Sequence, residues 1–190
     1  PKYRVVATFS APNGGKALGD LGVGTPSEAV DRLMNNMVPY YESTARPVLP
    51  ALELIGTIAH RQPTETGRWS TRYSDAQIDQ FLAVARDRGA ILIIDIQPGQ
   101  SPWMDEVKHF RKYLEMPDVS LALDPEWKVD KGEVPGQTRI GTIKPAEINE
   151  VTAYMQQIID EKKLPQKLLI VHEFKDYQLR NQDAIVNHHH

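Results

Sequence analysis

The chain has 190 residues, 41% of them hydrophobic, which is enough for one globular domain with a substantial core. Its net charge of −3 and the scattering of its lysines and arginines argue against a nucleic-acid partner. Cysteine is absent, which argues against thiol catalysis, and no apolar stretch approaches the roughly 18 residues of a membrane-spanning helix.

Short apolar runs alternate with segments of helical periodicity along the chain. Thr25 followed by Pro26 is typical of a helix start, and Ser74 is expected to cap a second helix. The apolar face of that helix recurs every three and four residues, at Ile78, Phe81, Leu82 and Ala85. We predict strands over residues 3–10, 50–58, 90–97, 119–124 and 167–174. We predict helices over residues 25–41, 74–89, 103–114, 145–162 and 177–186.

This alternation determines the predicted fold class. Strands separated by helices of ten or more residues form βαβ units and a parallel sheet. We expect a parallel (β/α) barrel of the TIM type, of which about five units are visible. An open doubly wound sheet is the alternative. Polar residues follow several of the strands, which favours the barrel, because an open sheet concentrates its ligand groups at one switch point.

The length and the two ends raise the question of completeness. A full barrel needs about 250 residues, so we expect a truncated chain or further residues beyond the visible ones. We expect that Pro1 is not the native start and that the histidines at 188–190 are the remnant of a purification tag. We therefore expect a single domain over residues 1–187. Five units would leave two open sheet edges, from which we expect a homodimer.

The most informative segment is Leu123-Asp124-Pro125-Glu126-Trp127, which ends an apolar strand. Asp124 and Glu126 project to the same side if the strand persists through Pro125. We expect Glu126 to act as a general acid or base and Asp124 to orient it, while Trp127 supplies a flat surface for a sugar. In the alternative interpretation Asp124 caps the following turn and Glu126 is solvated.

Two further strand ends carry polar residues. Asp95 and Gln97 share a parity after the apolar run 91–94, so both can face a barrel lumen. His172 and Glu173 follow the run 168–171, and since adjacent side chains point to opposite sides, only one enters a site; we favour His172. A structural aspartate and a hydrogen-bonded core histidine are the corresponding alternatives.

Other candidates carry weaker signals. Glu53 interrupts an apolar strand and either lines the lumen or pairs with an arginine, and His60 follows the same strand. Trp69 and Tyr73 lie on the next loop, where they either grip a ligand or pack over the barrel mouth. The glycine-rich loop over residues 11–24 lacks the spacing of a nucleotide-binding loop.

Several stretches resemble a known group of proteins: Leu18-Gly19-Asp20-Leu21-Gly22, Arg46-Pro47-Val48-Leu49-Pro50-Ala51-Leu52-Glu53, Asp95-Ile96-Gln97-Pro98-Gly99, Leu123-Asp124-Pro125-Glu126-Trp127, Glu147-Ile148-Asn149 and Leu164-Pro165-Gln166-Lys167. The chain resembles, over nearly its whole length, uncharacterised secreted or lipid-anchored bacterial proteins, common in actinobacteria, with a glycosidase-like TIM-barrel fold. The resemblance implies three further strands and an extracellular or cell-envelope location. The chain departs from the group at Glu173, where a glutamine is expected.

These observations favour hydrolysis of a glycosidic bond in an extracellular or cell-wall polysaccharide. The reaction needs two carboxyl groups, about 5–5.5 Å apart for retention and about 6.5–9.5 Å apart for inversion of the anomeric centre. We expect Glu126 to be the general acid and Asp95 or Asp124 to be the second group, with no cofactor. The expected substrate-binding residues are Trp127, Gln97, His172, Glu53, Trp69 and Tyr73.

Two alternatives remain open. Asp95, Asp124, Glu126 and His172 offer oxygen and imidazole ligands that suit Mg²⁺, Mn²⁺ or Ca²⁺, so a divalent cation could serve a lyase, isomerase or phosphodiesterase. A non-catalytic carbohydrate-binding surface protein on the same scaffold is the other alternative, because a fold does not determine a function.

Overall fold

The computed structural model describes residues 2–13, 22–43 and 45–186. Residues 14–21 of the predicted glycine-rich loop and the terminal histidines lie outside the described residues. The chain forms two compact units: unit 1 comprises Pro1–Gly56 and Tyr73–Ile94, and unit 2 comprises Thr57–Arg72 and Asp95–His190.

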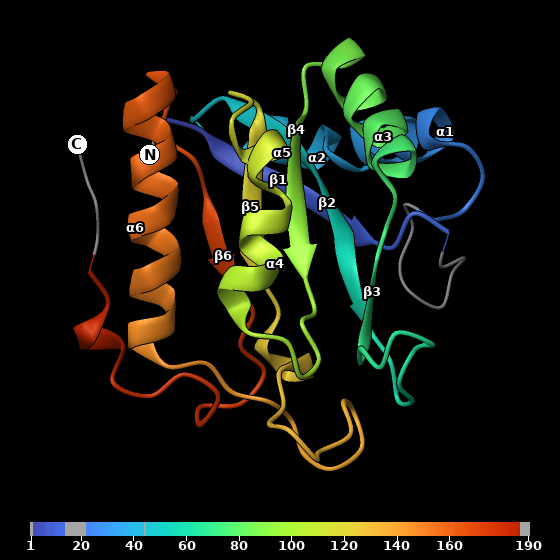
Figure 1. The fold of residues 1–190 in the computed structure, drawn as a ribbon. Coiled ribbons are helices and arrows are strands. Elements are labelled where there is room, and N and C mark those ends of the chain that lie inside the picture. The colour runs from blue at the N-terminus through green and yellow to red at the C-terminus, as the bar shows by residue number, and fades with distance from the viewer. Residues whose placement is uncertain (1, 14–21, 44, 187–190) are drawn as a thin grey trace. The chain divides into compact units, whose positions relative to one another are not determined.

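The protein has an α/β fold with a five-stranded parallel sheet, which confirms the predicted class and is consistent with part of a barrel and with an open sheet (Figure 1). A sixth strand, β3, pairs antiparallel with the end of β2 and was not predicted. In hydrogen-bonded order the parallel strands are β1 (Arg4–Ser10), β2 (Val48–Ala59), β4 (Ile91–Ile96), β5 (Val119–Leu123) and β6 (Leu169–Val171), and β3 is Ser70–Arg72.

Unit 1 contains β1, most of β2 and β4, and the helices α1 (Pro26–Asn36), α2 (Val38–Ser43) and α3 (Asp75–Asp87). Thr25 and Ser74 cap α1 and α3, each in a reciprocal pair of hydrogen bonds with the residue three positions later. Helices α1 and α3 contact each other, and the predicted apolar face of α3 is buried: Ile78, Phe81, Leu82 and Ala85.

The helix predicted over residues 25–41 is interrupted at Met37. Pro39 follows two residues later, in the first turn of α2. Proline has no amide hydrogen, and its ring collides with the carbonyl group four residues earlier in a continuous helix. The sequence therefore forms two short helices instead of one long helix.

Unit 2 contains β3, β5, β6 and the helices α4 (Trp103–His109), α5 (Arg111–Leu114) and α6 (Pro145–Lys162). Helix α6 has the bounds that its periodicity predicted, and it contacts α4. The helix predicted over residues 103–114 is divided at Phe110, whose backbone leaves the helical region (φ −88°, ψ 10°) while its ring is buried. Among the described residues, no helix has the length and apolar character needed to cross a bilayer.

The prediction of a helix over residues 177–186 is wrong, because these residues form only a single 3₁₀ turn, η3 (Gln182–Ala184). Asn181 lies in the left-handed region (φ 57°, ψ 46°), which interrupts a helix at that position, and the Gln178 side chain is buried among backbone groups. Its Oε1 accepts hydrogen bonds from the backbone amides of Phe174 (2.6 Å) and Lys175 (2.8 Å), and its Nε2 donates to the Gly141 carbonyl (3.4 Å). These bonds hold the segment before Gln178 against the loop that contains Gly141.

The long loop between β5 and α6 packs closely against its own backbone at Gly141. The Gly141 amide donates to the Glu126 carbonyl (2.8 Å), and a Cβ atom at Gly141 would overlap the carbonyl oxygens of Lys128 and Pro125. These oxygens are backbone atoms and cannot rotate away. Gly141 is therefore required by close backbone approach.

We predict that Gly141→Ala lowers the free energy of unfolding by about 3 kcal/mol, because an added methyl group must displace backbone. The matched control is Gly132→Ala, where a Cβ meets nothing within 4 Å but φ is +91°. The control should cost only about 1 kcal/mol, from backbone strain. Urea unfolding of both variants measures the difference, and an equal cost would contradict the close-approach explanation.

Candidate functional site

Gln97, which follows β4, joins the carboxyl ends of three strands in unit 2. The Gln97 backbone amide donates to the Thr57 carbonyl (2.9 Å), and its side-chain Oε1 accepts from the Ala59 amide (3.3 Å). Its Nε2 donates to Asp124 Oδ2 (3.3 Å). A single buried amide side chain thus links the end of β2 to the end of β5.

Backbone hydrogen bonds continue this connection to β5 and β6. The Asp124 amide donates to the Ile96 carbonyl (3.0 Å), and the His172 amide donates to the Leu123 carbonyl (3.0 Å). Gln97, Asp124 and His172, which the sequence predicted at strand ends, therefore lie on consecutive strand ends.

The local geometry of Asp124 differs from the prediction. Strand β5 ends at Leu123, and residues Pro125–Trp127 form a 3₁₀ turn, η2. Asp124 Oδ1 accepts a hydrogen bond from the Glu126 amide (3.2 Å). The strand does not persist through Pro125, so Asp124 and Glu126 do not alternate along it. The alternative interpretation, in which Asp124 caps the following turn, is the one that the structure shows.

Asp124 is buried, with 3% of its surface exposed, and this determines its ionisation. Burial raises the pKa of its carboxyl group from 3.8 to about 6. The positive charge of His172 lowers this pKa, the Glu126 carboxylate raises it, and hydrogen bonds from the Glu126 amide and the Gln97 side chain lower it. The effect of burial is the largest of these, so Asp124 exchanges a proton near neutral pH.

Asp95 and His172 form a second close pair in unit 2. A carboxylate oxygen of Asp95 and a ring nitrogen of His172 lie within 4.8 Å of each other. Asp95 is fully buried, whereas His172 is half-buried. The pair offers one oxygen and one nitrogen donor, which fits an orienting contact for the imidazole or part of a cation site.

The two tryptophans predicted to bind ligand are half-buried and pack against glycines. A Cβ atom at Gly136 would overlap the ring of Trp127, so part of that ring is covered by the loop after β5. The backbone of Gly99 has a φ of +62°, and a Cβ atom there would lie 2.6 Å from the Trp69 carbonyl oxygen. Packing therefore accounts for part of the surface of both residues.

Two predicted residues belong to unit 1. Glu53 is buried in the middle of β2, opposite Phe9 of β1. The Tyr73 hydroxyl donates to Asn13 Oδ1 (2.9 Å), and burial raises the pKa of Tyr73. In unit 2, His60 Nε2 forms a hydrogen bond with Thr71 Oγ1 (2.8 Å).

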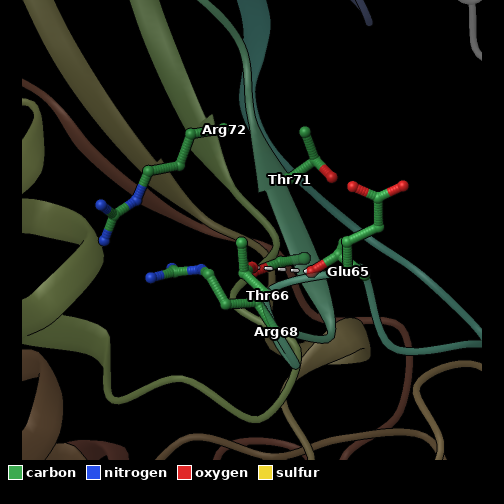
Figure 2. A pocket seen from close by; sticks show the side chains of 7 residues that line it. Glu65, Thr66, Arg68, Thr71 and Arg72 are labelled. Carbon is green, nitrogen blue, oxygen red and sulfur yellow. Dashed lines mark hydrogen bonds between the residues drawn. The ribbon is translucent and has the colours of Figure 1, made fainter.

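A buried ion-pair network in unit 2 had no signal in the sequence. The Glu106 carboxylate is fully buried and accepts from Arg72 Nε (2.8 Å), from Arg68 and from Thr57 Oγ1 (3.0 Å). Glu106 lies on α4, more than 30 positions from either arginine, and neither the charge pattern nor the periodicity indicates which acid they meet. Figure 2 shows the pocket beside these arginines.

No protein-family model, curated protein or solved structure matches the chain. The description of the site therefore rests on its own geometry and charge.

We predict a pH dependence of stability from Asp124. Since the folded state holds this proton more tightly than the unfolded chain, the carboxyl group favours folding most below about pH 4, and that contribution is lost as the pH rises through about 6. Asp124→Asn removes the contribution. The free energy of unfolding of the Asp124→Asn variant, relative to that of the wild type, should therefore rise by about 2–3 kcal/mol between pH 4 and pH 7.

Urea unfolding of both proteins at several pH values measures this difference. A difference that is constant with pH, or that falls as the pH rises, would contradict the assignment of a raised pKa to Asp124. Glu150→Gln, which removes an exposed carboxyl group on α6, serves as the control and should show no such trend.

Proposed function

We propose that unit 2 carries the active site of a hydrolase that cleaves a glycosidic bond by carboxyl acid–base chemistry. One observation supports it most: a buried carboxyl group with a pKa of about 6, Asp124, lies where four strand ends are joined. The carboxyl ends of parallel strands are the usual place for active sites in parallel α/β proteins. A carboxylic acid that keeps its proton near neutral pH is suited to protonate a leaving oxygen.

In this proposal Asp124 is the general acid, and the half-buried Glu126 is the second carboxyl group. This exchanges the roles expected from the sequence, because the raised pKa belongs to Asp124. The Glu126 backbone amide is bonded to Asp124, so the two carboxyl groups belong to one turn. Asp95 is fully buried and is assigned a positioning role through His172 instead of contact with substrate.

The wider setting of this proposal comes from the sequence. We assign the sheet to a (β/α) barrel of the glycosidase-like type and the substrate to an extracellular or cell-wall polysaccharide, as the resemblance implies. The part of Trp127 that Gly136 leaves uncovered would contact a sugar ring. Gln97 would hold Asp124 in place through the hydrogen bond from its Nε2.

We predict that Asp124→Asn lowers the rate of glycosidic-bond cleavage by about 10²–10⁴-fold, the usual contribution of a general acid. Glu126→Gln should cause a loss of similar size. Release of reducing ends from a panel of cell-wall and extracellular polysaccharides measures the rate, and Glu150→Gln is the matched carboxyl-to-amide control. An Asp124→Asn protein with wild-type activity would exclude the assigned role. Tight binding of a glycan with no product would favour the non-catalytic carbohydrate-binding alternative.

A metal-dependent reaction is the second candidate, and the proximity of Asp95 and His172 is the observation that favours it. Under the leading proposal we predict that Mg²⁺, Mn²⁺ and Ca²⁺ leave the melting temperature of tag-free protein unchanged, since no cation is required. Differential scanning fluorimetry and metal analysis measure this. A stabilisation by Mn²⁺ that disappears in His172→Gln would favour the metal-dependent alternative instead.

A further inference from the structure

The ion-pair network around Glu106 carries more positive than negative charge. The two arginines Arg68 and Arg72 share this single carboxylate, so their paired charges sum to one surplus positive charge. The Glu106 side chain is fully buried, whereas 35% of Arg68 and 26% of Arg72 remain exposed. Arg72 uses all three of its guanidinium nitrogens on Glu106, His109 Nδ1 and the Asp105 carbonyl. Arg68 contacts Glu106 and Ser101 through Nη2, and part of its guanidinium group reaches solvent.

The exposed part of these arginines borders a pocket. The pocket has a volume of about 480 Å³, large enough for a small polar ligand. Figure 2 shows the Arg68 and Arg72 side chains extending to one side, while Glu65 and Thr71 extend to the other side. The lining residues are Thr64, Glu65, Thr66, Arg68, Ser70, Thr71 and Arg72.

Two buried polar groups of this pocket lack a hydrogen-bond partner among the described residues. They are the Ser70 hydroxyl and the Arg68 Nε. Ser70 is 1% exposed and lines the pocket on β3. Leaving a buried donor unpaired is unfavourable, and such groups usually have a partner. Both groups can donate to an oxygen atom, and the guanidinium group cannot accept.

We propose that this pocket binds an oxyanion, the phosphate, sulfate or carboxylate group of a small polar ligand. An anion on the arginine side of the pocket, from which Glu65 extends away, would accept from Arg68 Nε and the Ser70 hydroxyl. The planar fork of arginine donors matches the oxygens of phosphate and carboxylate groups. The proposal does not depend on the hydrolase activity, because it uses none of the residues around Asp124.

The test is isothermal titration calorimetry of the full chain with inorganic phosphate, sulfate and glucuronate, at an ionic strength fixed with sodium chloride. Phosphate and sulfate present tetrahedral oxyanions and glucuronate presents a planar carboxylate, so their relative affinities identify the preferred group. We expect saturable binding of at least one of them, at one site per chain. No saturable binding of any of the three would overturn the proposal.

Ser70→Ala is the most informative variant, because the hydroxyl makes no hydrogen bond to the described residues and its loss should leave the melting temperature unchanged. The affinity for the preferred anion should fall by about tenfold, as for a lost hydrogen bond to a charged group. Arg68→Lys keeps the positive charge that Glu106 requires but removes the Nε donor and the planar fork, and we expect a similar or larger loss.

The matched control is Arg139→Gln, which removes an arginine paired with Glu133 and Asp130 elsewhere in unit 2. The Arg139→Gln variant should bind the anion with the affinity of the wild type. Wild-type affinity in both Ser70→Ala and Arg68→Lys, with both variants folded, would overturn the proposal and place any bound anion elsewhere. A loss of affinity in Arg139→Gln as large as in Arg68→Lys would overturn it as well, since it would indicate a general charge effect.

Discussion

The arrangement of the strand ends in unit 2 depends on the side-chain amide of Gln97. It accepts from the Ala59 backbone and donates to Asp124, so it needs a donor and an acceptor at the same time. A glutamate at this position would place a second negative charge beside Asp124, and an aliphatic side chain would leave the Ala59 amide without its acceptor. The amide therefore holds a carboxyl group in a buried position without neutralising it.

Unit 2 buries two carboxyl groups in opposite electrostatic settings. Glu106 is surrounded by Arg68, Arg72 and the Thr57 hydroxyl, which suits a charged carboxylate and a structural role. Asp124 receives neutral hydrogen bonds, and its pKa reflects burial more than the charge of His172. Because a buried charge without full compensation is unfavourable, Asp124 is the one that takes up a proton. This contrast separates a carboxylate held by two arginines from a carboxyl group whose pKa lies near neutral pH.

The sequence predicted what depends on local patterns and missed what depends on distant partners. Helix α6 and the caps at Thr25 and Ser74 follow from side chains within a few positions, and all were predicted correctly. Strand β3 is three residues long and exists because it pairs with the end of β2, which no local pattern reveals. Pro125 indicates the turn that Asp124 caps, whereas the apolar run before it indicates a strand, and the strand ends at Leu123.

The same distinction applies to the candidate site. The apolar runs that end in Asp95, Asp124 and His172 were enough to predict which residues gather at the strand ends, because parallel strands bring their carboxyl ends together. The partition of roles was not predictable, since the pKa of Asp124 depends on Gln97 and on burial, neither of which a sequence position reveals. Glu106 was missed for the same reason: its partners are remote in sequence and near in space.

The burial of Asp124, and hence its acidity, depends on the two segments that follow the ends of β4 and β5. Two hydrogen bonds hold the loop after η2. The Val129 amide donates to the Gly99 carbonyl (3.0 Å), and Gln100 Nε2 donates to the Glu133 carbonyl (2.7 Å). These bonds tie the segment that follows Asp124 to the segment that follows Gln97. Opening them would admit water to Asp124 and lower its pKa toward the ordinary value, because water stabilises the ionised form. The hydrogen bonds of this loop and the proton affinity of Asp124 are therefore linked.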